Sequence, residues 1–333
     1  MPRNRNILLF TLTVLAILVL MVVDMATGST HIAPREILNA LLGRGDASII
    51  TIVREIRLSR ALTALMSGAA LSAAGLMMQT LFRNPLAGPH VLGITSGASL
   101  GVAVFILGIP AFGISSVLFK SLGMVGAAWI GSAAIIMLLV ALSSRIKDIM
   151  VILILGIMLG SGIDAIIQIL QYFGSEASLK SYVLWTMGSL GDVTGRELAI
   201  LAIAVVGGLA LSIPSVKPLN LLLLGEDYAK SMGTDVRRAR ILIFVSTTIL
   251  AGSITAFCGP IGFIGLAVPH ISRMLWKTAD HRVLLPASVL TGMATMLLCD
   301  IASKSLALPI NTVTALVGIP VLIMVVFKNQ FVK

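Results

Sequence analysis

Two carboxylates, Asp164 and Asp300, lie deep within long apolar segments of the sequence. An ionised carboxylate is costly in the hydrocarbon of a bilayer, so each must face a cavity, pair with a cation or carry a proton. A carboxylate that exchanges a proton could couple transport to a proton gradient, whereas one that lines a cavity could contact a solute. These residues are the first candidates for chemistry inside a membrane.

The stretch GPIGFIGLAVPHISR, residues 259–273, contains three glycines and two prolines between apolar segments. So many helix breakers would destabilise an uninterrupted membrane helix. Broken helices are tolerated in membranes only where protein or a water-filled cavity satisfies the freed backbone groups. The stretch therefore predicts a broken helix beside a translocation path.

Other kinds of active site are not indicated. The phosphate-binding pattern G-x-x-x-x-G-K-[ST] does not occur, so any ATP must be hydrolysed by another chain. The four histidines lack metal-ligand spacing, and no nucleophile is grouped with a base, so we predict neither a metal site nor an enzyme. Cys258 and Cys299 fall in apolar segments, which is typical of small buried residues.

The composition excludes a water-soluble domain. Of 333 residues, 57% are hydrophobic and 11% charged, and the mean hydropathy is +1.04. These values predict an all-α polytopic membrane protein. The net charge of +10 comes from Lys and Arg scattered among short loops, and there is no basic patch with interleaved aromatic residues, so we expect no nucleic-acid partner.

We expect about ten transmembrane helices in a single domain over residues 1–333. The apolar runs are 7–23, 59–82, 91–108, 121–142, 149–171, 193–213, 241–258, 264–276, 283–303 and 312–327. The eighth run is too short to cross alone unless it tilts or re-enters. The first run is long for a signal peptide and no cleavage site follows, so it is interpreted as a retained span.

The distribution of basic residues predicts the orientation. With the N-terminus inside, 15 of the 24 Lys and Arg residues fall on the cytoplasmic side. This bias predicts that both termini are cytoplasmic, in a multi-pass protein of the cytoplasmic (inner) membrane. The external loop 24–58 runs against the trend with four arginines, which suggests a functional reason.

Two segments are weakly alike at an offset of 180 residues. The matched pairs are Arg57 and Arg237, Arg60 and Arg240, Leu62 and Leu242, Leu86 and Leu266, Ala87 and Ala267, Pro89 and Pro269, and His90 and His270. In the ten-span arrangement the two segments run in opposite directions, as in the inverted repeats of transporters. Chance similarity between Ala- and Leu-rich helices is the alternative.

The cytoplasmic loop 214–240 is the longest on its side. It contains LNLLLLGEDYAKSMG, residues 219–233. We predict a short helix from Gly225 to Ser231, stopped by Gly233, that lies along the membrane face and docks another protein. A solvated connector is the alternative, although connectors are usually shorter.

Six stretches together resemble one family, and they occur in the family's order from about residue 56 to the C-terminus. They are IRLSRAL (56–62), NPLAGPHVLGITSGAS (84–99), LWTMGSL (184–190), LNLLLLGEDYAKSMG (219–233), GPIGFIGLAVPHISR (259–273) and DHRVLLPAS (280–288). The chain resembles the FecCD-type permeases, the membrane subunits of type II ABC importers for iron-siderophores, haem and cobalamin. Any one stretch alone would be a weak signal.

The resemblance implies ten helices per subunit and a homodimer with the pathway at its two-fold interface. Two ABC ATPase subunits would bind the cytoplasmic face, and an extracytoplasmic substrate-binding protein would dock outside. Membrane lipid would surround the assembly. No cofactor is expected on this chain, because ATP and Mg²⁺ would be held by the partner ATPase.

The resemblance also implies roles for individual residues. The ATPase-coupling residues would be Leu224, Gly225, Glu226, Asp227, Ala229 and Gly233. Binding-protein docking would fall to Arg57, Arg60 and Lys304, with snorkelling at the membrane interface as the alternative. Near Lys304 the chain departs from the family, because Ala307 and Asn311 replace an acid and a glycine common there.

An inner gate would be formed by Asn84 and Leu86 with Ile149 and Met150. Apolar side chains there suit gating by dewetting, although ordinary packing at span ends explains them equally well. Asp164 replaces a small residue on the span that would line the pathway, so we predict that it contacts substrate or water. Asp300 belongs to the family pattern, in which it would satisfy backbone groups near a broken helix.

One rival hypothesis from a different class stays open. A proton-coupled secondary transporter would use Asp164 or Asp300 as the proton carrier. It would not need the predicted docking helix, which favours the ABC permease. The cargo is left open among siderophores, haem and cobalamin, because the family motifs are shared.

Overall fold

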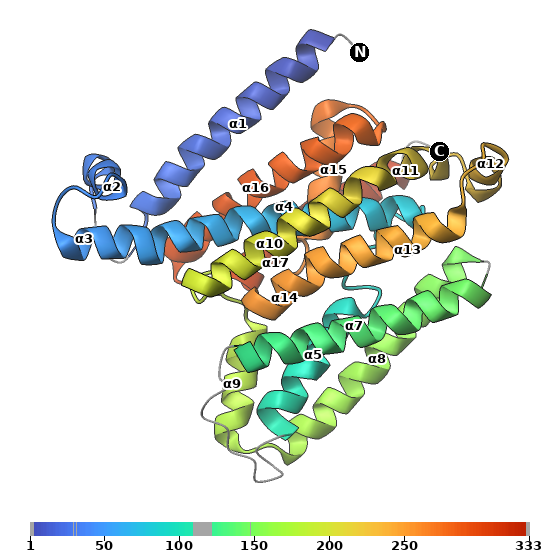
Figure 1. Ribbon diagram of the computed structural model, residues 1–333, viewed down its shortest axis with the longest axis horizontal. Coiled ribbons are helices and arrows are strands. Elements are labelled where there is room, and N and C mark those ends of the chain that lie inside the picture. Colours follow the sequence, from blue (N-terminus) through green and yellow to red (C-terminus); the bar gives the residue numbers. More distant parts are fainter. Residues whose placement is uncertain (1–2, 29, 31, 109–121, 147, 331–333) are drawn as a thin grey trace.

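The computed structural model describes residues 3–28, 30, 32–108, 122–146 and 148–330. The regular elements in these ranges are all helices (Figure 1). The first half contains α1 (Arg3–Ala26), α2 (Pro34–Leu41), α3 (Ala47–Thr51), η1 (Ile52–Arg57), α4 (Leu58–Leu81), α5 (Ile94–Ala103), η2 (Val104–Gly108), α7 (Leu122–Arg145) and α8 (Ile149–Phe173). The second half contains α9 (Glu176–Thr186), α10 (Gly195–Ser212), η4 (Ile213–Ser215), α11 (Val216–Leu222), α12 (Glu226–Ser231), α13 (Val236–Thr247), η5 (Thr248–Gly252), α14 (Ser253–Cys258), α15 (Ile264–Trp276), α16 (His281–Leu306) and α17 (Ile310–Gln330).

Each of the ten apolar runs corresponds to helix in the described part of the chain. Seven helices there are long and apolar enough to cross a bilayer, and the apolar helices Ile94–Gly108 and Ile310–Val325 are shorter. The eighth run is α15, whose 13 residues span about 20 Å, less than the ~30 Å hydrocarbon core. The prediction of a span too short to cross alone is therefore confirmed.

The helix α4 lies at the centre of the bundle (Figure 1), and 19 of its 24 residues are buried. Helices α16, α15, α10 and α13 pack around it. Glycines allow the closest approaches: a Cβ atom on Gly68 would lie 2.1 Å from the carbonyl oxygen of Gly292, and one on Gly75 would lie 1.7 Å from that of Gly265. Small residues at such crossings let membrane helices pack backbone to backbone.

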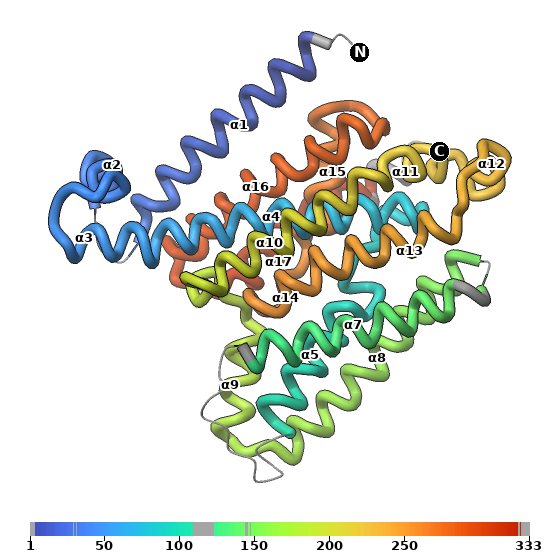
Figure 2. Tube along the Cα trace, viewed as in Figure 1, coloured from blue at the N-terminus to red at the C-terminus, as the bar shows by residue number. Residues whose placement is uncertain are grey.

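A second group of helices lies beside this core. In it α5 packs against α7 and α8. Gly97 and Gly131 provide the close contact between α5 and α7, because a Cβ on Gly131 would lie 2.0 Å from the Gly97 carbonyl oxygen. The trace in Figure 2 shows the chain turning at the end of α8 into α9, at the same end of the bundle as α2 and α3.

The two halves of the predicted repeat run in opposite directions. In Figure 1, α4 runs toward the end of the bundle that carries α12, whereas α13 starts at that end and runs away from it. The beginning of α1 and the end of α17 also lie toward the α12 end. This arrangement agrees with an even number of crossings and with an inverted repeat.

The sequence did not predict α2, α3 and α9, which are too short to cross a membrane. Pro34 begins α2, and Asp46 caps α3 by accepting a hydrogen bond from the amide of Ser48 at 2.8 Å. Ile37 and Val53 pack with Met25 of α1 in a small apolar cluster separate from the main core. This cluster holds α2 and η1 against the end of α1.

We predict that Gly75→Ala lowers the melting temperature of the detergent-solubilised protein. Its methyl group would force α4 away from α15, and overpacking of this kind costs about 1–3 kcal/mol. Gly207→Ala in α10 is the matched control, because a Cβ there meets nothing within 4 Å. Equal melting temperatures for the two variants would contradict the close packing of α4.

Candidate functional site at two ends of the helix bundle

Buried charges join three helices at the end of the bundle opposite α12. The fully buried Asp300 of α16 accepts hydrogen bonds from Arg60 of α4, at 3.0 Å from Nε and 2.8 Å from Nη2. Lys304, one turn later in α16, lies 2.9 Å from the other Asp300 oxygen. Asp300 therefore pairs with two cationic side chains, which corrects the expectation that it satisfies backbone groups near a broken helix.

A second carboxylate, Asp24 of α1, completes this cluster and was missed by the sequence analysis. The Lys304 ammonium group lies 2.8 Å from the Asp24 carboxylate and 3.1 Å from its carbonyl oxygen. Asp24 is fully buried, and Lys304 is only 7% exposed. An acid at the end of the first apolar run was the available signal, because a carboxylate at that depth needs a partner.

Arg57 holds the end of α1. Its Nη1 donates to the carbonyl oxygens of Met25 at 2.6 Å and Ala26 at 3.2 Å, and its Nη2 donates to the Thr30 hydroxyl at 2.9 Å. The last carbonyls of a helix have no partner within the helix. A guanidinium group there satisfies them and interacts favourably with the negative end of the helix dipole. Arg57 is consequently buried.

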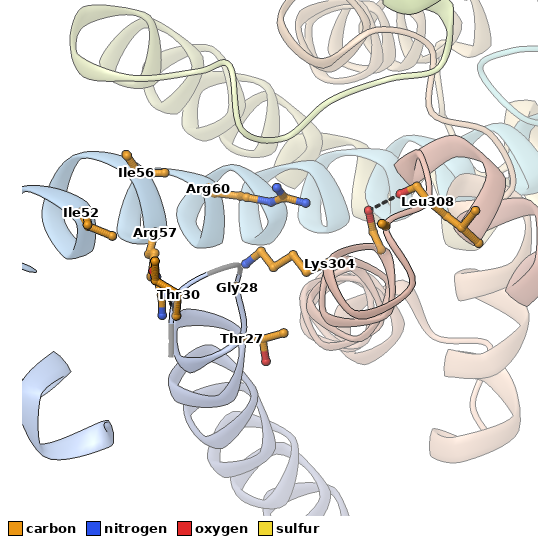
Figure 3. Close-up of a pocket in the computed structure, with 11 residues that line it drawn as sticks. Thr27, Gly28, Thr30, Ile52, Ile56, Arg57, Arg60, Lys304 and Leu308 are labelled. Carbon is orange, nitrogen blue, oxygen red and sulfur yellow. Dashed lines mark hydrogen bonds between the residues drawn. The ribbon is translucent and has the colours of Figure 1, made fainter. Parts of the chain in front are cut away.

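The three residues predicted to dock a binding protein line one cavity of about 540 Å³ (Figure 3). Arg57, Arg60 and Lys304 reach it from η1, α4 and α16. Arg60 is the most accessible, with 28% of its side chain exposed. The structure thus brings the three residues together but holds each with internal partners, and their docking role stays a prediction.

The helix interruption is present at the predicted position, between Cys258 and Ile264. Gly259 has φ +77°, and Phe263 has φ +65°, an unusual value for a residue with a Cβ. The amide of Gly262 donates to Asn311 Oδ1 at 3.1 Å, and the Cys258 carbonyl accepts from the Ser189 amide at 2.9 Å. Asn311, which departs from the family pattern, therefore satisfies the broken backbone.

The two Pro-His segments of the predicted repeat meet beside this interruption. Pro89 and His90 line a cavity of about 240 Å³ together with Phe263 and Leu266. A hydrogen bond of 2.9 Å also joins His270 Nε2 to the Pro85 carbonyl oxygen. The segment that carries the predicted gate residues Asn84 and Leu86 is thus attached to α15.

The predicted gate residues lie in the turn after α4 and at the start of α8, and two of them expose apolar side chains. The Asn84 carboxamide accepts a hydrogen bond from the Leu86 amide at 2.9 Å, which fixes the turn. Leu86 and Met150 are exposed, and Ile149 is partly buried. Asp148 caps α8 by accepting from the Met150 amide at 2.8 Å. A gating role for these residues stays a prediction.

At the other end of the bundle, α12 matches the predicted helix within one residue. Gly225, with φ +112°, precedes it, and Gly233, with φ +80°, follows it. Ala229 is fully buried on the inner face of α12. Asp227 is exposed and forms an ion pair with Lys230 of the same helix at 3.1 Å. The exposed apolar surface around α12 consists of Leu224, Tyr228 and Met232. Of these three residues, only Leu224 was predicted from the sequence.

Glu226 differs from Asp227 because it points back into the bundle. Its carboxylate forms an ion pair with Arg240 of α13, whose side chain is 5% exposed. The preceding helix α11 is also anchored, because Asn220 donates to Asp280 at 2.6 Å and accepts from the His281 amide at 2.8 Å. Hydrogen bonds from the Arg282 amide and from Asn220 hold the pKa of Asp280 below its usual range.

Asp164 lies on an exposed face of α8. Ser161 and Gln168, one turn before and after it, are also exposed. Together with the partly exposed Gln171, they form a polar line along a mostly apolar helix. Asp164 was predicted from the sequence, whereas its polar neighbours on this face were not, although their helical spacing was the available signal.

We predict that Asp300→Asn strongly destabilises the protein. The substitution removes a carboxylate from two buried or half-buried cations, and breaking a buried ion pair on one side costs about 3–5 kcal/mol. Asp227→Asn is the control, because Asp227 is fully exposed. Thermal unfolding in detergent should give a clearly lower midpoint for the first variant, and an unchanged midpoint would refute the importance of the cluster.

The chain is similar to known transport proteins over nearly its whole length. The FecCD transport family matches residues 15–328. The hemin transport system permease protein HmuU of Yersinia pestis is 36% identical over 280 residues, which cover 83% of each chain. The vitamin B12 import system permease protein BtuC of Salmonella typhimurium is 35% identical over 335 residues, covering 98% of this chain and 97% of that one.

Solved structures agree with these relatives. A structure described as a metal-chelate type ABC transporter in an inward-facing conformation superposes with a TM-score of 0.84 at 30% identity, covering 96% of this chain and 99% of that one. PsaBC from Streptococcus pneumoniae, with a TM-score of 0.57 at 16% identity, shares the fold alone. By this similarity and by its helix arrangement, the chain belongs to the FecCD transport family and is a membrane permease subunit of an ABC importer rather than an enzyme.

Proposed function

We propose that the chain forms the translocation pathway of a type II ABC importer for an organic metal chelate: an iron-siderophore, haem or cobalamin. Two copies would enclose the pathway, two ATPase subunits would bind the α12 end, and a substrate-binding protein would deliver cargo to the opposite end. The α12 end, with both termini, would then be cytoplasmic. The chain itself would bind no cofactor.

The observation that carries this proposal is the exposed apolar surface around α12. Glycines with positive φ on either side limit the helix to a short element, and the buried Ala229 packs it against the rest of the protein. The exposed Leu224, Tyr228 and Met232 combine with the acidic Asp227 to give a surface that is apolar and charged at once. Exposing large apolar side chains to water is unfavourable for a solvated connector, whereas a partner protein would bury them in an interface.

The opposite end supports docking of a second protein. The cavity lined by Arg57, Arg60 and Lys304 concentrates positive charge where acidic side chains of a binding protein could approach. Because Arg60 and Lys304 already have internal partners, an acidic side chain of the binding protein would compete with Asp300 and Asp24 for them. Arg60 is the most accessible base and would be contacted first.

The polar line on α8 supports a pathway along that helix. Ser161, Asp164 and Gln168 are exposed on a helix long enough to span a bilayer. Polar side chains at that depth are favourable only against protein or water, so this face would line the conduit rather than contact lipid. A proton-coupled transporter that uses Asp300 is disfavoured, because that carboxylate is paired with Arg60 and Lys304.

We predict that uptake into proteoliposomes requires the partner ATPase, the binding protein and ATP. A panel of haemin, cyanocobalamin and ferrichrome, each offered with its binding protein, would identify the cargo. Uptake should be abolished by vanadate and unaffected by an uncoupler. Uptake that proceeds without ATP and stops with the uncoupler would favour the secondary transporter instead.

We predict that Asp164→Ala lowers the rate of this uptake about tenfold, because one wall of the conduit loses its charge. Expression and ATPase binding should be normal, since the side chain is exposed. Glu176→Ala, which removes an exposed acid just beyond the end of α8, is the control. Unchanged uptake by Asp164→Ala would remove this residue from the pathway.

A further inference from the structure

The segment around α12 lies beside one of the two segments that carry the predicted gate residues and is linked through Arg240 to the other. On one side, a Cβ atom on Gly225 would lie 3.8 Å from the guanidinium group of Arg83, the residue before Asn84. On the other side, Arg240 pairs with Glu226 and also donates to the carbonyl oxygen of Ile146 at 3.4 Å. Ile146 lies three residues before Ile149, where α8 begins.

The Arg240 side chain is suited to transmit force. It is almost fully buried on α13, and its two terminal nitrogens contact different segments: Nη2 contacts the carboxylate on α12, and Nη1 contacts the end of α7. The planar guanidinium group fixes the angle between these contacts, which the single ammonium group of a lysine cannot do. An ion pair shielded from water also resists displacement more than an exposed one.

We infer that Arg240 is a positioning residue that couples movement of α12 to the cytoplasmic end of α8. Displacement of α12 by an ATPase pulls on Glu226, which moves the guanidinium group and with it the segment that leads into Ile149 and Met150. This inference rests on the proposed function, because it assigns the transmission path between the ATPase and the gate.

The matched control lies on the same helix. Arg238 lies two residues before Arg240 on α13. Its side chain is 88% exposed, and its ion pair with Asp235 joins only residues at the start of the same helix. Arg238→Gln and Arg240→Gln therefore make the same chemical change on α13, and only the second removes a contact between α12 and the α7 end. Arg240→Lys keeps the charge without the two-sided contact.

The experiment uses the assembled complex of permease, ATPase and binding protein. Hydrogen exchange is measured at residues 148–152 with and without ATP and vanadate, and uptake per ATP hydrolysed is measured with the cargo identified in the panel. In Arg240→Gln we expect normal assembly, a nucleotide-induced change at α12 but not at 148–152, and uptake per ATP lowered about tenfold. Arg240→Lys should lie between, and Arg238→Gln should match the wild type.

An unchanged response at residues 148–152 in Arg240→Gln would overturn the inference. So would failure of this variant to assemble with the ATPase, since Arg240 would then serve folding or docking and not transmission. A wild-type complex that neither hydrolyses ATP nor takes up cargo would instead contradict the proposed function. The two failures are therefore distinguishable.

Discussion

A bilayer offers no water to its interior, so every charge and every free backbone group there must find a partner within the protein. Asp300 shows how this constraint acts on the fold. Its carboxylate is fully buried, and it is stable as an anion because Arg60 and Lys304 converge on it from α4 and α16. Lys304 in turn reaches Asp24, so the same requirement attaches α1 to the core.

The same constraint explains how a broken helix persists between α14 and α15. The freed amide of Gly262 is satisfied by Asn311, and the Cys258 carbonyl is satisfied by the Ser189 amide. Both partners come from other parts of the chain, so the interruption is supported from outside its own helix. A relative with glycine in place of Asn311 would need another acceptor for that amide.

Close packing makes the bundle able to transmit movement. At the glycine contacts, α4 packs against α15 and α16 with no room for a methyl group. Displacement of one of these helices would therefore move the others. Polar contacts then select which segments move together: Asn220 joins α11 to α16, His270 joins α15 to Pro85, and Arg240 joins α12 to Ile146. A conduit opened by a partner protein requires this combination of rigid spans and specific connections.

Hydropathy and helix breakers are local, and for that reason the sequence determined the apolar spans, the interruption at 259–263 and the helix bounded by Gly225 and Gly233. The partners that join buried charges across different helices are not local. Asp300 lies 240 positions from Arg60, and Asp24 lies 280 positions from Lys304. Only the tertiary structure could decide that Arg57 caps α1, that Lys304 is buried between two acids, and that Arg240 joins α12 to the α7 end. No residue-by-residue pattern specifies which distant helix will satisfy a buried charge, because that depends on how the whole bundle packs.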